Sequence, residues 1–298
     1  MRYLLLLAIF YSTCGFCLEP LTIGSWNFQW LTAEPSQMGP KRDAQDYHQF
    51  NDYIRQSQID ILAFAEVGSV NAIRQVIGNG YDIELSHRAF DKLSEGKWRQ
   101  YTGFAIRKGL VYQRHPDLNL NVNHNNRLRN AVDIELTTAS GKQLRLLAVH
   151  LKSGCFTQSK SSSFSCQTLA RQARLLHRWI VKRNKQKQRF VILGDFNRRM
   201  LNVENQWFFH MLQANEHQMK NHLIIINHGA SHCWSKNINK HQKVWMSEHK
   251  QFIDFILMNK LSAAAYISNS FKEVAASRFA TQHFNLSDHC LISAKLKQ

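Results

Sequence analysis

Side chains that could bind a metal ion or a phosphate group stand at the ends of the apolar runs in this sequence. Glu66 follows the run at 59–64, and Asp195 and Asn197 follow the run at 190–193. The ends of strands that share a sheet meet at one rim, and ligand sites favour such rims. A single Asp or Asn there is usually a turn residue, whereas a large set indicates chemistry. The full set is Asn27, Glu66, His150, Asp195, Asn197, Asp254, Asp288 and His289.

This set suits the hydrolysis of a phosphate diester. Carboxylate oxygens bind hard divalent cations such as Mg²⁺, and a bound cation neutralises the charge that keeps hydroxide away from phosphate. A histidine that a carboxylate holds in one tautomer can orient or deprotonate the attacking water. The leaving oxygen needs a proton, which Asp195 and His150 could each supply, and the sequence leaves that choice open.

The elements that must position these residues follow from the pattern of apolar residues. Helical spacing predicts helices at 44–58 and 166–185. Residues 115–130 lack periodicity and are expected to form a loop. Hairpins and helical crossovers are mixed, so the chain is not a simple alternation of strand and helix. Strands are predicted at 21–26, 59–64, 102–106, 110–112, 131–136, 144–149, 190–193, 252–258 and 290–296.

Length and composition predict one globular domain after a targeting segment. The 298 residues are 44% hydrophobic, and no linker rich in Gly, Pro or Ser divides them. Residues 1–17 combine an early arginine, an apolar run and small residues, which is typical of a secretory signal peptide. We therefore expect a signal peptide at 1–17, a domain at 18–298, and a secreted or periplasmic protein.

Four cysteines remain after the predicted signal: Cys155, Cys166, Cys233 and Cys290. In an exported chain an even number favours disulfides, although three connectivities are possible. A Cys155–Cys166 bond would close one surface loop, and Cys233–Cys290 would be the second bond. Reduced cysteines in the core are the alternative.

The formal net charge of +17 suggests a polyanionic partner such as nucleic acid, anionic lipid or an acidic polysaccharide. A proteome that is basic throughout would explain the charge equally simply. Arg198 and Arg199 directly follow Asn197 and are candidates for phosphate binding. Residues 228–250 mix lysine, histidine, Trp234 and Trp245, and we interpret them as a long basic loop that could cradle nucleic acid. We expect Trp234 to pack in the core, and leave Trp245 open between core and surface.

The order of the motifs resembles the endonuclease/exonuclease/phosphatase superfamily, whose fold is that of deoxyribonuclease I. The resemblance runs from Ile23 to Leu296. It rests on seven segments in order: Ser25-Trp26-Asn27, Ala63-Phe64-Ala65-Glu66, Thr102-Gly103-Phe104-Ala105, His150-Leu151-Lys152-Ser153, Gly194-Asp195-Phe196-Asn197, Phe252-Ile253-Asp254-Phe255 and Ser287-Asp288-His289. The resemblance implies an α+β fold, a four-layer α/β/β/α sandwich with two mixed β-sheets packed face to face and helices outside.

The same resemblance implies roles for the site residues, with Mg²⁺ or Mn²⁺ as the metal. Glu66 corresponds to the main metal carboxylate, with Asn27 and Asp288 nearby in the coordination shell. Asp195 and Asn197 would flank the attacked phosphate. His150 would contact its oxygens, and His289 would pair with Asp254 as the activating couple.

Two further positions follow from the resemblance. Arg129 corresponds to a phosphate-binding arginine, and Arg127 could substitute for it. Gln100 falls near the position of a glutamate that orients the first histidine in deoxyribonucleases. Without that carboxylate, His150 would stay neutral more readily.

These observations predict a secreted, metal-dependent phosphodiesterase, a monomer that cleaves DNA, RNA or both with little sequence preference. A sphingomyelinase-like lipid phosphodiesterase or a phosphatase of the same fold is the first alternative. We expect no exposed hydrophobic hairpin and no stable membrane association, which disfavours it. A catalytically dead protein that coats polyanions is the second alternative, and the complete set of site residues disfavours it.

Overall fold

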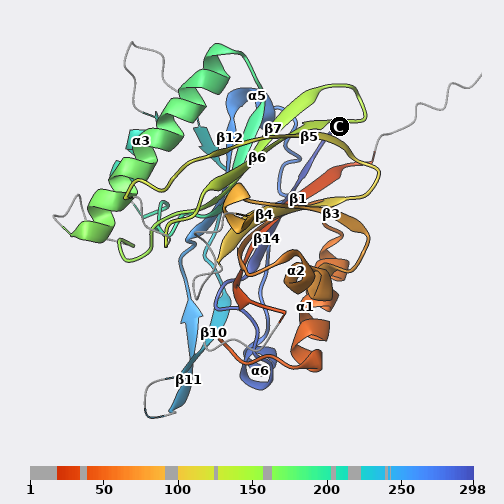
Figure 1. Ribbon diagram of the computed structural model, residues 1–298, viewed down its shortest axis with the longest axis vertical. Helices are drawn as coiled ribbons and strands as arrows, with labels where there is room; N and C mark the ends of the chain where they lie inside the picture. The colour runs from red at the N-terminus through yellow and green to blue at the C-terminus, as the bar shows by residue number, and fades with distance from the viewer. Residues whose placement is uncertain are drawn as a thin grey trace, which may run out of the picture.

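The computed structural model describes residues 19–33, 39–90, 100–123, 127–156, 163–202, 206–213, 223–238, 241 and 243–298. Two six-stranded sheets form its centre (Figure 1). The predicted signal segment at 1–17 lies outside the described residues. No helix in the described ranges is long and apolar enough to cross a membrane.

The first sheet positions Asn27, Glu66 and His289. Strands β1 and β2 are its parallel pair, and the other pairs are antiparallel. In spatial order it consists of β13 (Lys272–Val274), β14 (Leu291–Leu296), β1 (Leu21–Leu31), β2 (Ile61–Val67), β4 (Tyr101–Arg107) and β3 (Tyr81–Leu85).

The second sheet is mixed in the same way, because β7 and β8 are parallel and the remaining pairs are antiparallel. Its spatial order is β5 (Val111–Leu118), β6 (Ala131–Thr137), β7 (Gln143–His150), β8 (Phe190–Asp195), β12 (Asp254–Asn259) and β9 (Leu223–Ile225).

The two sheets face each other across a single apolar core. Fully buried side chains from both sheets meet there, including Ile23 and Phe104 from the first and Leu146 and Ile192 from the second. Burying such side chains contributes roughly 1.5–3 kcal/mol each to folding. This packing brings β1 next to β8 and β12, and therefore brings together residues that are far apart in sequence.

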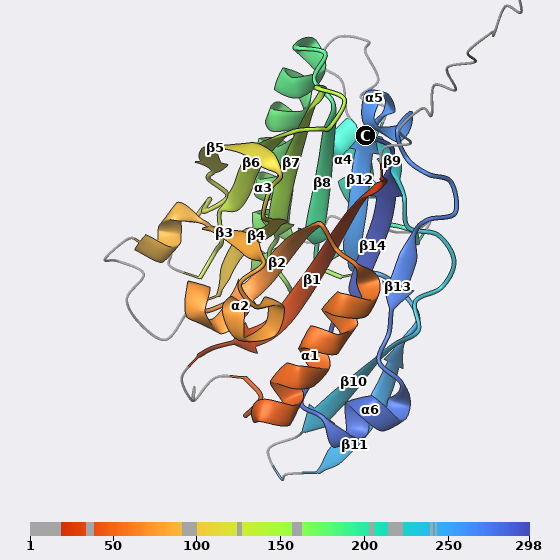
Figure 2. The ribbon, with the colours of Figure 1, turned by 90° about the vertical axis from the view of Figure 1, so that its right-hand side faces the viewer.

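Helices cover the outer face of each sheet, as Figures 1 and 2 show. Helices α1 (Ala44–Ser57) and α2 (Val70–Ile77) pack on the first sheet, where Phe50 contacts Trp26. Helices α3 (Phe164–Lys185) and α4 (Trp207–Gln213) pack on the second. The predicted four-layer α/β/β/α sandwich is thereby confirmed.

The two long helices begin where the sequence provides capping residues. Asp43 and Asp46 form a capping box at the start of α1, and Ser163 accepts a hydrogen bond from the Cys166 N–H at the start of α3. Such caps stabilise a helix by about 1 kcal/mol. Three further short helices are η1 (His87–Phe90), α5 (Lys260–Ala263) and α6 (Arg278–His283).

Two loop predictions are wrong in part. Strand β5 extends to Leu118 and so includes the first four residues of the segment 115–130 that was expected to be a loop. Residues 228–250 are largely a separate two-stranded ribbon of β10 (Cys233–Ile238) and β11 (Val244–His249), which extends beyond the sheets next to α6 (Figures 1 and 2). The ribbon exposes three large apolar side chains, those of Ile238, Val244 and Trp245.

Both predicted disulfides are present. Cys155–Cys166 closes the segment between β7 and α3, and Cys233–Cys290 joins the base of the ribbon to the start of β14. The second bond therefore ties the ribbon to the residue that follows His289.

Candidate active site

Glu66 is held at an irregularity shared by β1 and β2. The register of the β1–β2 pair shifts between Asn27 and Leu31, and Gln29, Trp30 and Glu66 all adopt positive φ. For residues other than glycine this conformation costs on the order of 1–3 kcal/mol, and it is concentrated at functional sites. The Trp30 N–H donates to Glu66 Oε2 at 3.2 Å, which leaves Oε1 of Glu66 directed toward the site.

Asp195 ends β8 and lies in a dense set of hydrogen bonds. The Asn197 N–H donates to Oδ1 at 2.7 Å, and the side-chain amides of Asn197 and Asn27 donate to Oδ2 at 3.0 and 3.1 Å. The preceding residue must be glycine, because a Cβ on Gly194 would lie 2.0 Å from the carbonyl oxygen of Val149. The Gly-Asp-Phe-Asn motif thus allows β7 and β8 to approach closely and fixes the Asp195 carboxylate.

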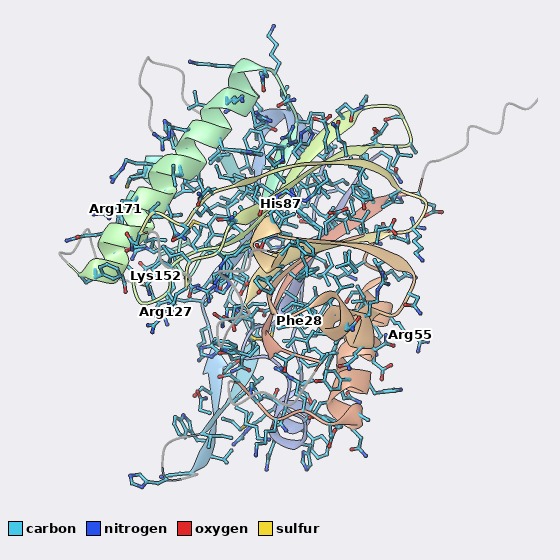
Figure 3. The ribbon with its side chains drawn as sticks, in the orientation of Figure 1. Phe28, Arg55, His87, Arg127, Lys152 and Arg171 are labelled. Carbon is cyan, nitrogen blue, oxygen red and sulfur yellow. A yellow bond between two sulfur atoms is a disulfide. The ribbon has the colours of Figure 1, made fainter. Side chains whose placement is uncertain are left out.

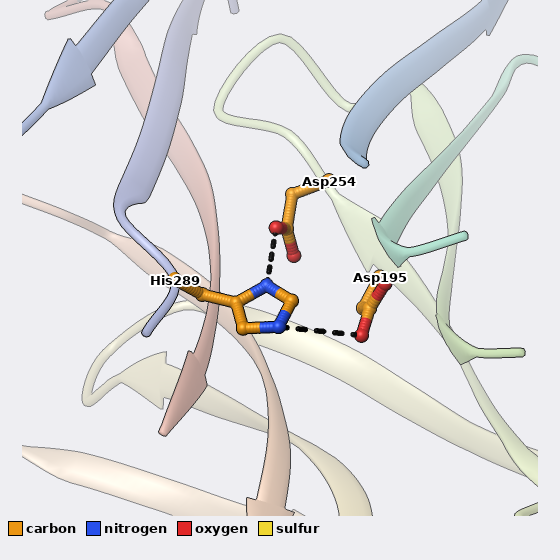
Figure 4. A group of neighbouring side chains, drawn as sticks. All are labelled: Asp195, Asp254 and His289. Carbon is orange, nitrogen blue, oxygen red and sulfur yellow. Dashed lines mark hydrogen bonds and ion pairs between the residues drawn. The ribbon is translucent and has the colours of Figure 1, made fainter. Parts of the chain in front are cut away.

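His289 lies between two carboxylates (Figure 4). Its Nδ1 is 2.6 Å from Asp254 Oδ2, and its Nε2 is 3.8 Å from Asp195 Oδ2. Burial lowers the pKa of His289, but the charges of Asp254 and Asp195 outweigh it and raise that pKa well above its usual value. Burial, opposed by the charge of His289 and supported by that of Asp254, raises the pKa of Asp195 to about 7. The three groups therefore form one unit for holding and moving a proton.

His150 ends β7 on the other side of Asp195. Its Nε2 is 3.5 Å from Asp195 Oδ2 and 3.6 Å from Glu66 Oε1, and the residue is 2% exposed. Burial and the charge of Arg129 lower its pKa well below the usual value, so the imidazole is neutral. Its Nδ1 has no hydrogen-bond partner among the described residues. Gln100 instead accepts a hydrogen bond from Arg129, which agrees with the expected loss of an anionic partner.

The three candidate phosphate-binding arginines have different environments. Arg129 lines the site, with Nη2 3.8 Å from Glu66 Oε1, and Arg199 also lines it. Arg198 does not line the site, and the structure places its side chain away from the cavity. Its side chain is 0% exposed, donates to the backbone oxygen of Cys155 at 2.8 Å and lies over the ring of Trp207. Consecutive residues point in opposite directions here, so only one of the pair reaches the site.

One cavity of about 400 Å³ connects these groups. Aromatic side chains at its wall include Phe156 and Phe252, and His249 of β11 also reaches it. Asn27 does not line it, because its side chain is 1% exposed and points to Asp195. The predicted residues that do line it are Glu66, Arg129, His150, Asp195, Asn197, Arg199, Asp254, Asp288 and His289.

The cavity fits a divalent cation. Five carboxylates line it, those of Glu66, Asp195, Asp254, Glu273 and Asp288, and the raised pKa of Asp195 shows how poorly burial accommodates that charge. Asp195, Asp254 and His289 are close enough to share an ion. However, the Nδ1 of His289 bonds to Asp254, and a protonated imidazole has no lone pair for a metal. Glu66 and Asp288 therefore offer the better oxygen ligands for a hard divalent cation.

The structure also identifies supporting residues that were not predicted. Gln29 Oε1 accepts from the Asp288 N–H at 3.1 Å, and Ser287 donates to the backbone oxygen of Asn27. Ser287 was visible in the Ser-Asp-His motif. Glu273 of β13 also lines the cavity and accepts hydrogen bonds from Ser231 and the His232 N–H, and no local pattern marks it.

The sandwich fold and this grouping of carboxylates and histidines define a hydrolase that acts on phosphate esters. The model of the endonuclease/exonuclease/phosphatase family matches residues 24–289, and the chain belongs to that family. A search among curated proteins finds no match.

Solved structures with the same fold share little sequence with this chain. TDP2 from Caenorhabditis elegans is 15% identical, with a TM-score of 0.62 over 94% of this chain and 75% of that chain. A Danio rerio TDP2 complexed with single-strand DNA product is 14% identical, with a TM-score of 0.58 over 94% and 99%. The AP endonuclease LMAP from Leishmania major is 12% identical, with a TM-score of 0.59 over 94% and 88%.

Proposed function

We propose that this protein is an exported, metal-dependent endonuclease that hydrolyses DNA, RNA or both with low sequence specificity. The observation that carries the proposal is the position of His289 between Asp254 and Asp195, inside a cavity that Glu66 and Asp288 also line. Bound Mg²⁺ or Mn²⁺, held by Glu66 and Asp288, would supply the positive charge that a phosphodiester requires.

The side chains have distinct proposed roles in the reaction. Asp254 fixes the His289 imidazole so that Nε2 faces the cavity. Once His289 has lost its proton, Nε2 can accept a proton from water beside Asp195. His150, which is neutral, can donate a hydrogen bond to a phosphoryl oxygen. Asn197 and Asn27 orient Asp195, and Asn27 therefore acts by positioning rather than as a metal ligand in the cavity.

Positive charge around the cavity supports a polyanionic substrate. Arg129 and Arg199 line the cavity, and Figure 3 shows Arg127, Lys152 and Arg171 on the flank of the molecule where α3 begins. Contacts to phosphate carry no base information, so such a surface gives affinity without sequence preference. One of the similar solved structures is a TDP2 complexed with single-strand DNA product and another is an AP endonuclease, which agrees with this substrate class.

We also propose that the protein is exported. A signal peptide at 1–17 would precede the domain at 18–298, and two disulfides are typical of proteins from oxidising compartments. We also propose that the domain acts as a monomer.

A lipid phosphodiesterase is the second candidate, favoured by the exposed Ile238, Val244 and Trp245 on the ribbon. One experiment separates the two candidates. The purified mature protein is incubated with plasmid DNA, total RNA or sphingomyelin vesicles, each with magnesium, manganese or chelator. We expect metal-dependent cleavage of nucleic acid, whereas cleavage of sphingomyelin alone would reject the nuclease proposal.

A further inference from the structure

The β10–β11 ribbon presents two chemically different faces. Side chains alternate along a strand, and directly paired residues share a face. The pairs Cys233–His249, Ser235–Ser247 and Asn237–Trp245 therefore lie on one face, which we call the Trp245 face. Trp234, Lys236, Ile238, Val244, Met246 and Glu248 lie on the opposite face.

The opposite face is occupied near its base by α6 and the segment that follows it. The guanidinium of Arg278 lies over the Trp234 ring at 5.5 Å, and Lys236 Nζ donates to Asn285 Oδ1 at 3.1 Å. Helix α6 contacts both strands of the ribbon. This packing fixes the direction of the ribbon. On the Trp245 face it leaves Trp245 and His249 exposed, whereas Ser235 between them is buried.

The Trp245 face begins at the wall of the catalytic cavity. Cys233 and His249, its innermost pair, both line that cavity together with Asp288 and His289. From His249 to Trp245 the strand advances four residues, which is about 13 Å at the usual rise. A chain that leaves the cavity along this face would therefore meet Trp245 within a few nucleotides.

Small polar side chains connect the cavity to Trp245. Ser235 Oγ hydrogen-bonds to His249 Nε2 at 2.8 Å, and Asn237 Nδ2 donates to Ser247 Oγ at 3.1 Å. Beyond them the Trp245 side chain is 45% exposed. Among the described residues, no ring stacks on its indole and no acceptor bonds to its N–H. The Trp245 face is therefore polar next to the cavity and ends at an exposed indole ring.

We propose that the Trp245 face is a subsite for single-stranded nucleic acid, on which the Trp245 indole stacks a base several nucleotides from the cleaved phosphate. The subsite rests on the proposed nuclease function and extends it. Two observations support the subsite. The Trp245 face is continuous with the cavity, and the net charge of +17 attracts polyanions. Base–aromatic stacking needs no particular base, and so it preserves low sequence specificity.

A bilayer fits this ribbon less well than a nucleic acid strand. The exposed Ile238 and Val244 lie on the face opposite to Trp245, so the three side chains do not form one apolar surface. Residues 239–243, which join the two strands, include two lysines and one histidine and no apolar residue. Insertion of that segment into hydrocarbon would be costly.

Binding measurements with two oligomers of equal charge test the subsite. One is a single-stranded oligonucleotide of about twelve residues, within the range of known single-strand sites, and the other is its abasic counterpart. Both are labelled and titrated in chelator, so that they are not cleaved. We expect Trp245→Ala to raise the Kd of the base-containing oligomer by roughly five-fold or more. Its effect on the abasic oligomer should be less than about two-fold, and Trp245→Phe should recover most of the affinity.

Val244→Ala is the matched control, because Val244 is equally exposed on the opposite face and should leave both affinities unchanged. Equal weakening of both oligomers by Trp245→Ala, or no weakening, overturns the subsite even if the wild type cleaves nucleic acid. If Trp245→Ala loses binding to vesicles of phosphatidylserine and phosphatidylcholine but keeps its binding to the oligonucleotide, the subsite is overturned in favour of lipid docking. A wild type that neither binds nor cleaves nucleic acid rejects the proposed function as well.

Discussion

Asp254 pairs in register with Asp195 across the antiparallel strands β12 and β8. The pairing sets two carboxylates side by side at the end of the second sheet, and His289 reaches them from the first sheet. Two adjacent carboxylates disfavour each other's charge, and the pKa of Asp195 rises to about 7 through burial, which the charge of His289 opposes and that of Asp254 supports. A protonated His289 relieves the repulsion, so the sandwich itself creates the proton-transfer unit.

The pairing predicts how the pH dependence changes when one carboxylate is neutralised. Asp254 is a main cause of the raised pKa of His289. In Asp254→Asn that pKa should fall, so the acidic limb of kcat/KM against pH should move to lower pH by roughly 1–3 units. The maximal rate should drop about 100-fold or more, because an amide can hold the wrong tautomer. A limb that stays at the same pH would show that His289 is not the titrating group.

The same unit predicts non-additive losses. If Asp254 acts only through His289, the double variant Asp254→Ala/His289→Ala should be no less active than His289→Ala alone. Steady-state rates on one nucleic acid substrate for the two single variants and the double variant measure this. Losses that multiply would mean that the two residues act separately.

Metal dependence is expected to rest on Glu66. Glu66→Gln keeps the shape of the side chain but removes its charge, so activity should fall by roughly 100-fold or more, since outer partners of metal ligands alone change affinity or activity by about 10–100-fold. Calorimetric titration with Mn²⁺ should show weaker binding to the variant than to the wild type. Asp52→Asn on α1 is a control carboxylate outside the cavity, and it should bind Mn²⁺ as the wild type does. Wild-type activity in excess chelator would refute the metal assignment.

Much of this site could be predicted because its residues follow continuous apolar strands. Asp195 and Glu66 stand directly after such runs, and the motif order then fixed which strand ends meet. The irregularity at Gln29 and Trp30 could not be predicted, because no glycine marks the positive φ. The outcome for Arg198 and Arg199 also depended on tertiary packing, since the sequence does not show which of two adjacent side chains faces the cavity.

The ribbon was missed for a different reason. Its strands mix polar and apolar residues on both faces, so neither period two nor a buried run is evident. Non-local contacts hold the ribbon in place, namely the Cys233–Cys290 bond and the packing of α6. Such contacts join segments more than 40 residues apart and leave no local signal.

The two disulfides should differ in their effect on activity. Removing either as a Cys→Ser pair should lower the free energy of unfolding by roughly 2–4 kcal/mol, as measured by urea denaturation. Only the loss of Cys233–Cys290 should also lower kcat, because Cys290 follows His289 and Cys233 lines the cavity. Peptide mapping of the secreted protein without reductant should first show both bonds. Equal kcat losses in the two double variants would argue against a specific role for Cys233–Cys290.

The adjacent arginines Arg198 and Arg199 provide a matched test of how charge at the cavity contributes to substrate binding. Arg199 lines the cavity, so Arg199→Ala should weaken binding of nucleic acid similarly for all sequences. Each phosphate contact releases counterions, and the slope of log K against log salt should therefore become shallower by about 1. Arg198 is buried, donates to the backbone oxygen of Cys155 and lies over the ring of Trp207. Arg198→Ala should instead lower the free energy of unfolding by about 1–3 kcal/mol and leave the salt slope unchanged.

Fluorescence titrations in chelator from about 50 to 200 mM sodium chloride, where screening is set by a Debye length near 10 Å, measure the slopes. If the two substitutions flatten the slope equally, the buried position of Arg198 does not describe the protein in solution.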